Sequence, residues 1–249
     1  MPARRGPRSS NIIGRRALLG LLLAVLLASC GGDPDRVRAD HYDSFWLWAG
    51  VSAPAELGRA KSVYILDGEI RHDARHYVPL RAGTPTARGP ELWLVVRTDT
   101  LDWPDEAAAA IAAKADRWSS AGTRVAGIQV DFDARTKHLD DYARFLAGLR
   151  RSLPPRYKLS ITGLMDWSAN GDPAALLALR GIVDEVVIQT YQGRSTIWGY
   201  ERYFERMRGF PIPFKVGLVE NGRWIEPDGL RAEPNFRGYV VFLLPRAAR

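Results

Sequence analysis

Two aspartates separated by one residue end an apolar segment of this sequence. They are Asp131 and Asp133, in the run Gly-Ile-Gln-Val-Asp-Phe-Asp that begins at Gly127. Because side chains alternate along a β-strand, we expect both carboxyl groups on the same side, roughly 7 Å apart. Two carboxyl groups this close should differ in pKa, one ionised and one protonated, which is the arrangement that general acid catalysis requires.

The two aspartates could instead be structural, capping the helix that follows or binding Lys137 at the surface. Acidic side chains at the end of a buried apolar strand destabilise the fold, however, and a functional role is a reason for a protein to tolerate that cost. The sequence therefore favours a catalytic or binding role for Asp131 and Asp133.

Further residues that could line the same site stand at or near the ends of other apolar segments. Aromatic members of this set favour a carbohydrate ligand, because a flat ring can stack on the face of a sugar, although core packing is the alternative for each ring. The set consists of Trp48, Arg97 (followed by Thr98 and Asp99), Asp166, Trp167, Gln189, Tyr191 and Phe242, together with Gln129 on the strand of the two aspartates.

Other chemistries have weaker support in the sequence. His72 and His76 have the i,i+4 spacing of a zinc protease motif, but Asp73 stands where that motif needs Glu, and Pro79 follows soon after. Asp-x-Asp also occurs in metal-dependent glycosyltransferases, but no nucleotide-binding pattern accompanies it here. The Gly-x-Ser-x-Gly motif of serine hydrolases is absent. We therefore expect neither a metal nor a cofactor.

Eight apolar segments alternate with helix-like segments along the chain. Near-continuous apolar runs are typical of strands that are buried on both faces of a parallel sheet. The pattern predicts a compact single-domain α/β protein, a (β/α)8 TIM-type barrel with its site at the C-terminal ends of the strands. A doubly wound open sheet is the alternative, but no Gly-rich phosphate turn follows the first strand. The expected strands are residues 45–49, 62–66, 91–97, 124–132, 158–162, 185–190, 213–219 and 239–244.

The segment around the two aspartates resembles the strand-four signature of glycoside hydrolase family 18, the chitinase-like barrels. That family's pattern is Asp-Gly-x-Asp-x-Asp-x-Glu. Gly127 matches its glycine, and Gln129 stands at its second Asp. Asp131 matches the third Asp, and Asp133 stands at the catalytic Glu.

Two further segments extend the resemblance. Gln189-Thr190-Tyr191 is similar to the Met-x-Tyr that ends strand six of the family, and Phe242 lies near the Trp of strand eight that floors the sugar-binding subsite. The resemblance implies hydrolysis assisted by the acetamido group of the sugar. In it Asp131 would orient that group, Asp133 would protonate the leaving oxygen, and Tyr191 would contact the reacting sugar.

The sequence departs from the family at two of these positions. Asp133 is one methylene shorter than Glu, and a carboxyl group misplaced by about 1 Å can lower a rate about a hundredfold. Gln129 replaces an Asp that would tune the pKa of its neighbour. The chain is also similar to an uncharacterised bacterial domain-of-unknown-function family with the same Gln-x-Asp-Phe-Asp-Ala strand, followed by Leu-Ser-Ile-Thr.

Residues 1–29 resemble the signal peptide of a bacterial lipoprotein. Basic residues precede an apolar run of about a dozen residues, whereas a span of the bilayer needs about 20. The run ends in Leu-Ala-Ser-Cys, similar to a lipobox, so Cys30 is predicted to carry the lipid anchor.

Residues 30–41 would be the lipidated cysteine and tether, and residues 42–249 the barrel. We expect a membrane-anchored, periplasm-facing envelope protein, in the outer membrane because Gly31 replaces the Asp that signals inner-membrane retention.

Removal of the leader changes the charge of the chain. The net charge of +7 falls to +2, because the leader contains five arginines and no acids. The remaining basic residues are scattered among Asp and Glu, so we expect no nucleic-acid partner.

Cys30 is the only cysteine, which excludes a disulfide framework. We expect a monomer.

Two functions are consistent with these residues. The first is a glycoside hydrolase that acts on an envelope or imported polysaccharide, with Asp133 as acid and base and Asp131 as the orienting carboxylate. The second is a non-catalytic carbohydrate-binding or envelope-assembly lipoprotein with the same barrel.

Overall fold

The computed structural model describes residues 33–49, 55–74, 76–134 and 139–245. The chain divides into two compact units, residues 1–36 and residues 37–249. Only residues 33–36 of the first unit are described, so the predicted leader and Cys30 lie outside the described residues. The second unit is the barrel domain.

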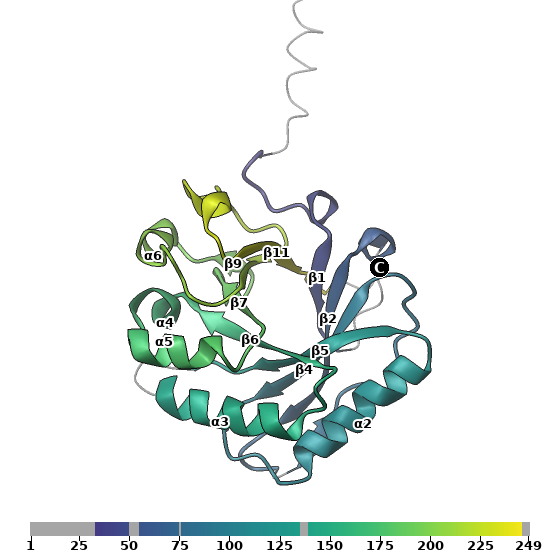
Figure 1. Ribbon diagram of the computed structural model, residues 1–249. Helices are drawn as coiled ribbons and strands as arrows, with labels where there is room; N and C mark the ends of the chain where they lie inside the picture. Colours follow the sequence, from purple (N-terminus) through teal and green to yellow (C-terminus); the bar gives the residue numbers. More distant parts are fainter. Residues whose placement is uncertain (1–32, 50–54, 75, 135–138, 246–249) are drawn as a thin grey trace, which may run out of the picture. The chain divides into compact units, whose positions relative to one another are not determined.

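Eight parallel strands form a closed ring in this domain (Figure 1). Pairing of the first strand with the second, at Phe45 and Val63, and with the last, at Trp46 and Phe242, closes the ring. The predicted (β/α)8 barrel is confirmed, and the alternative of an open sheet does not hold. In ring order the strands are β1 (Ser44–Leu47), β2 (Ser62–Ile70), β4 (Glu91–Thr98), β5 (Arg124–Asp131), β6 (Lys158–Leu164), β7 (Glu185–Gln189), β10 (Phe214–Val219) and β11 (Phe236–Phe242).

Helices cover the ring unevenly. The longest, α2 (Ala107–Ser120) and α3 (Leu139–Ser152), lie outside the strands on the side of β4, β5 and β6 (Figure 1). The chain then forms α4 (Met165–Asn170), α5 (Pro173–Arg180) and α6 (Glu201–Arg206). Elsewhere the described connections are short: the 3-10 turns η3 (Ala55–Arg59) and η5 (Leu230–Ala232), and β3 (Tyr77–Pro79), which pairs antiparallel with β2. Among the described residues, no helix is both long and apolar enough to cross a membrane.

Alternation along the strands builds two separate cores. Outward-facing residues pack against the helices, and inward-facing residues fill the ring. Inside the ring, Tyr64 and Trp93 stack with their centroids 5.4 Å apart, and Trp46 and Phe242 stack at 4.0 Å. Because both faces of each strand are buried, the strands read as continuous apolar runs in the sequence.

Gly127 permits the close pairing of β5 with β6. A Cβ atom at this position would lie 2.2 Å from the backbone oxygen of Lys158 and 2.8 Å from a ring carbon of Trp93. The glycine of the motif is therefore required by strand packing.

The barrel domain begins before the predicted boundary at residue 42. Val37 and Ala39 are buried, the latter in the 3-10 turn η2 (Ala39–His41). The N–H of Val37 donates to the Gly222 carbonyl at 2.8 Å, and its carbonyl accepts from the Asn221 N–H at 2.9 Å. Val37 and Ala39, predicted to belong to the tether, are thus part of the barrel domain, and Val37 is bonded to the loop that follows β10.

Candidate functional site

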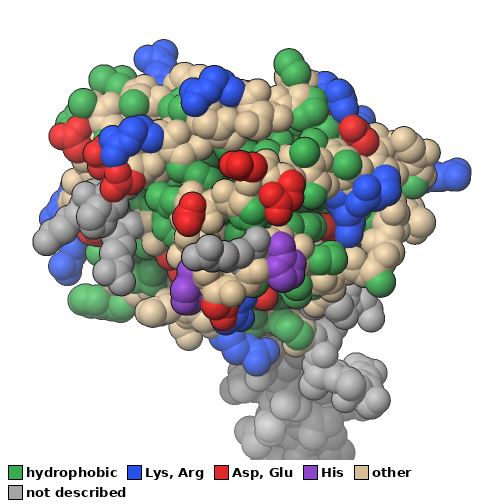
Figure 2. Space-filling model, turned by 90° about the horizontal axis from the view of Figure 1, so that it is seen from below, with side chains coloured by type: hydrophobic (Ala, Val, Ile, Leu, Met, Phe, Trp, Pro, Cys, Tyr) green, Lys and Arg blue, Asp and Glu red, His purple; other side chains and the backbone are tan. Residues whose placement is uncertain are grey.

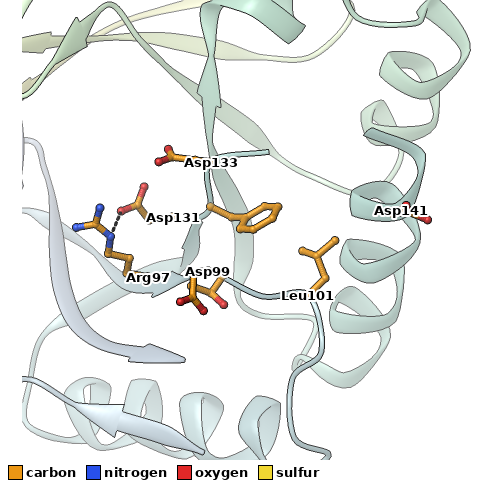
Figure 3. Close-up of a pocket in the computed structure, with 8 residues that line it drawn as sticks. Arg97, Asp99, Leu101, Asp131, Asp133 and Asp141 are labelled. Atoms are coloured by element: carbon orange, nitrogen blue, oxygen red, sulfur yellow. Dashed lines mark ion pairs between the residues drawn. The ribbon is translucent and has the colours of Figure 1, made fainter. Parts of the chain in front are cut away.

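The two aspartates lie at the C-terminal end of β5. Asp131 is its last residue, and Asp133 follows in the loop toward α3. Figure 3 shows both side chains extending to the same side of the strand, as the alternation predicts. Asp131 is only 9% exposed, whereas Asp133 is exposed. Lys137, the partner considered for a surface role, lies outside the described residues.

The Asp131 carboxylate has two partners from neighbouring strands. Its Oδ1 accepts a hydrogen bond from the Thr162 hydroxyl at 2.9 Å, and its Oδ2 lies 4.0 Å from Nε of Arg97. Burial raises the pKa of Asp131, and the negative charge of Asp133 adds to this effect, while Arg97 and Thr162 oppose it. Asp131 therefore holds a proton more readily than an ordinary aspartate.

Tyr191 lies near the same carboxylates, directly after β7, which is two strands from β5 in the ring. It begins β8 (Tyr191–Gln192), which forms a hairpin with β9 (Ser195–Thr196) directly after β7. Burial raises its pKa well above the ordinary value, with a further contribution from the charge of Asp131, while a hydrogen bond with Gln189 acts in the opposite direction. Tyr191 therefore keeps its proton and can donate a hydrogen bond to a ligand.

One cavity of about 800 Å³ gathers most of the predicted site residues. It lies at the C-terminal ends of the strands, where barrel enzymes keep their active sites. An adjacent cavity of about 540 Å³ shares Arg97, Asp131 and Asp133 and extends to Asp99 (Figure 3). The predicted residues that line the larger cavity are Trp48, Arg97, Asp131, Asp133, Asp166, Gln189, Tyr191 and Phe242.

Aromatic rings form one wall of the larger cavity. The centroid of Phe242 lies 5.6 Å from that of Trp48 and 5.0 Å from that of Tyr191. The guanidinium carbon of Arg97 lies 5.4 Å from the centre of the Trp48 ring, which places a cation beside the aromatic wall. Apolar rings next to carboxylates and a guanidinium are suited to a ligand with both apolar faces and polar edges, such as a sugar.

Gln129 does not line the cavity. It is fully buried, accepts a hydrogen bond from Nε1 of Trp46 at 3.0 Å and donates one to the Ser160 hydroxyl at 3.0 Å. It faces the interior two residues before Asp131, so it lies one layer deeper in the barrel. Its position supports the floor of the site.

Trp167 also lies away from the cavity, although its neighbour Asp166 lines it. Both residues belong to α4, where successive side chains point in directions about 100° apart. Asp166 is exposed, whereas Trp167 is fully buried in the core between the strands and the helices.

Sequence reasoning missed several residues of the site, among them Thr162 and Arg194. Thr162, which bonds Asp131, lies two residues after Ser160 on β6, and two polar residues at alternate positions of an apolar strand are a usable sign of inward-facing groups. Arg194 brings a second cation to the cavity from the β8–β9 hairpin. Nothing local marks it, because the fold of the hairpin places it there.

The two histidines considered for zinc have other partners. The backbone N–H of His72 donates to Asp99 at 2.8 Å, and its Nδ1 lies 3.1 Å from the same carboxylate. Nδ1 of His76 contacts the Ala74 carbonyl. Among the residues that the structure describes, no group of three or more His, Cys, Asp or Glu side chains could hold a metal ion.

Charged side chains are mixed over the face shown in Figure 2. Acidic side chains lie among apolar ones over its middle, and most lysine and arginine side chains lie toward its border. On the described part of this face the basic side chains therefore do not form a single patch of the kind that follows a phosphate backbone.

The fold and the cavity define a closed (β/α)8 barrel with a carboxylate-bearing site at its C-terminal face. Residues 89–199 match the family described as Domain of unknown function (DUF3142). This match confirms the predicted likeness to an uncharacterised family. No curated protein matches the sequence.

Solved structures of chitinase-like proteins resemble the chain at low identity. The spore cortex-lytic enzyme SleL of Bacillus cereus is 18% identical over 70% of this chain and 49% of its own, with a TM-score of 0.49, so the chain spans about half of its length. The tamarind chitinase-like lectin is 11% identical over 81% and 94%, with a TM-score of 0.49. The xylanase and α-amylase inhibitor protein XAIP-II of Scadoxus multiflorus is 9% identical over 80% and 92%, with a TM-score of 0.51. The likeness to XAIP-II concerns the barrel fold alone.

Proposed function

We propose that this protein is a lipid-anchored protein of the bacterial cell envelope whose barrel binds and hydrolyses a polysaccharide. The observation that carries the proposal is the convergence of Asp131, Asp133, Asp166 and Tyr191 on one cavity with an aromatic wall. These residues come from three separate strand ends, and a shared cavity is what a common ligand requires.

The geometry supports distinct roles for the carboxyl groups. Asp133 is exposed at the mouth, where it can reach a glycosidic oxygen and act as acid and base. Asp131 is buried and accepts a hydrogen bond from the Thr162 hydroxyl. A carboxyl group fixed in this way is suited to orienting the reacting part of the sugar. The protonated hydroxyl of Tyr191 supplies a hydrogen bond to the same sugar.

The envelope location rests on the leader and on Cys30, which would carry a diacylglyceryl group. Such an anchor confines the ligand to glycans that a membrane-bound domain facing the periplasm can reach. We place the protein in the outer membrane, because Gly31 follows the lipidated cysteine.

Carbohydrate binding without hydrolysis is the second candidate. It is favoured by Asp133, because a general acid is usually kept protonated by burial, whereas Asp133 is exposed and is one methylene shorter than Glu. The fold does not decide between the two, since the barrel that matches at a TM-score of 0.51 is described as an inhibitor protein.

A single assay separates the candidates. Wild type, Asp133→Asn and the exposed control Asp105→Asn would be incubated with aryl glycosides, chitin oligomers and peptidoglycan fragments, and both turnover and binding would be measured. We expect turnover by wild type and by Asp105→Asn, and its loss in Asp133→Asn with binding retained. Turnover that survives Asp133→Asn contradicts the assigned role. Binding without turnover by wild type establishes the second candidate.

A further inference from the structure

An exposed tryptophan, Trp198, directly follows the cavity-lining Ile197 but does not itself line the cavity. The side chain of Trp198 is 86% exposed, and the guanidinium carbon of Arg202 lies 5.6 Å from the centre of its ring. Ile225 on a neighbouring segment is 49% exposed. Large apolar side chains that are exposed on adjoining segments, together with the charges around them, can mark an interaction surface.

Segments 194–202 and 221–225 form this surface, which we call the hairpin rim. A Cβ atom at Gly222 would lie 2.5 Å from the Thr196 hydroxyl, so the two segments touch there. The Tyr200 hydroxyl donates to the Ile225 carbonyl and accepts from its N–H, both at 2.7 Å. Arg194 of the rim lines the cavity, so the rim is also part of the cavity wall.

The charge of the hairpin rim is positive. It contains three exposed arginines, Arg194, Arg202 and Arg223, and one exposed acid, Glu201. Tryptophan is enriched where proteins meet the interface of a bilayer, and arginines beside it are attracted to anionic headgroups. The composition of the rim therefore fits the surface of an anionic membrane.

The N-terminal end of the barrel domain lies at the same rim. Val37 is hydrogen-bonded to Asn221 and Gly222. Cys30 precedes Val37 by seven residues, and seven extended residues span at most roughly 25 Å. A lipid on Cys30 would therefore keep the hairpin rim within that distance of the bilayer.

We propose that the hairpin rim docks on the surface of an anionic phospholipid bilayer, so that the cavity opens toward the membrane that holds the anchor. The proposal rests on the lipid anchor at Cys30 and is independent of whether the site hydrolyses its ligand. Docking adds a second attachment to the lipid anchor and selects glycans that are bound to that membrane or lie against it.

Two matched cysteine variants test the docking. In the lipidated full-length chain the sulfur of Cys30 carries the anchor, so Trp198→Cys and Leu177→Cys each introduce a single thiol for labelling. Leu177 is the control, because it is 56% exposed and lies on α5, outside the hairpin rim. Each variant would be labelled with the fluorophore NBD and reconstituted into phosphatidylcholine vesicles with and without phosphatidylglycerol.

We expect the fluorophore at position 198 to emit at shorter wavelength and to be quenched several-fold less by iodide when phosphatidylglycerol is present. The fluorophore at position 177 should be equally accessible in both vesicles. Equal quenching at the two positions, shielding that does not depend on phosphatidylglycerol, or failure of the protein to float with the vesicles would each overturn the proposal.

The same variants, assayed in detergent, separate this proposal from the proposed function. Binding and turnover of free chitin oligomers in detergent should be equal for wild type and Trp198→Cys, because Trp198 does not line the cavity. Shielding at position 198 in a protein without turnover supports docking and refutes hydrolysis. Turnover without shielding refutes docking and leaves hydrolysis standing.

Discussion

Nε of Arg97 lies 4.0 Å from the Asp131 carboxylate, beyond hydrogen-bonding distance but within the range of a direct ionic interaction (Figure 3). The parallel pairing of β4 with β5 sets this relationship, because Arg97 stands opposite Asp131 in the register. The cation opposes the effect of burial on the carboxylate and so tunes the protonation of the site.

Arg97→Gln should raise the pKa of Asp131 further, because Arg97 is the largest of the influences that lower it. A titration of the Asp131 carboxyl carbon by NMR should therefore move to higher pH, and the pH dependence of ligand binding should move with it. Arg97→Lys keeps the positive charge and should restore most of the titration. If the titration is the same in wild type and Arg97→Gln, the ionic coupling is absent.

Asp131→Asn should stabilise the fold at neutral pH. The pKa of Asp131 is higher in the folded than in the unfolded protein, so its favourable contribution is complete below the unfolded value and is lost as the pH rises through the folded value. We expect the variant to melt above wild type at pH 7, because the neutral amide removes the cost of burying a charged carboxylate. Below pH 3.8, the ordinary pKa of an aspartate side chain, the difference should vanish.

Calorimetry across this pH range measures the effect. The exposed Asp105→Asn, at a residue that does not line the cavity, is the control and should change the melting temperature little. A variant that melts below wild type at pH 7 would show that the contacts of the carboxylate with Thr162 and Arg97 outweigh the cost of its burial.

Gln129→Ala should destabilise the barrel by roughly 2–4 kcal/mol, because it leaves the buried N–H of Trp46 without an acceptor and opens a cavity. Denaturant unfolding gives the free energy. Gln192→Ala, at an exposed glutamine of the β8–β9 hairpin, should change it by less than about 0.5 kcal/mol. Equal effects of the two variants would contradict a supporting role for Gln129.

Gly127→Ala should prevent stable folding, since the new methyl group would collide with the Lys158 backbone inside the β5–β6 pairing. We expect a loss above about 3 kcal/mol, the range of severe overpacking. Gly148→Ala on α3 is the matched control, because a Cβ there meets its nearest neighbour at 3.9 Å and alanine favours a helix by roughly 0.5–1 kcal/mol. Yield and melting temperature distinguish the two, and a folded Gly127→Ala would show that β6 can move.

The sequence by itself determined the strands and the orientation of Asp131 relative to Asp133. Both are local properties: burial on two faces makes a strand continuously apolar, and alternation places residues i and i+2 on one side. The same local pattern indicates that Phe242 lies near the end of a strand and that Tyr191 follows one, so both stand near the C-terminal face. It carries no information on depth, so Gln129 and Asp131 look equivalent in sequence although a full layer of the barrel separates them.

Only the tertiary structure decided which of these residues meet. Closure of β1 on β11 brings Trp46 against Phe242 across almost the whole chain, and the β8–β9 hairpin brings Arg194 to a cavity that no local signal foretells. The raised pKa of Asp131 likewise arises from burial by other strands and from charges on them. These properties depend on long-range contacts, which exist only once the ring has closed.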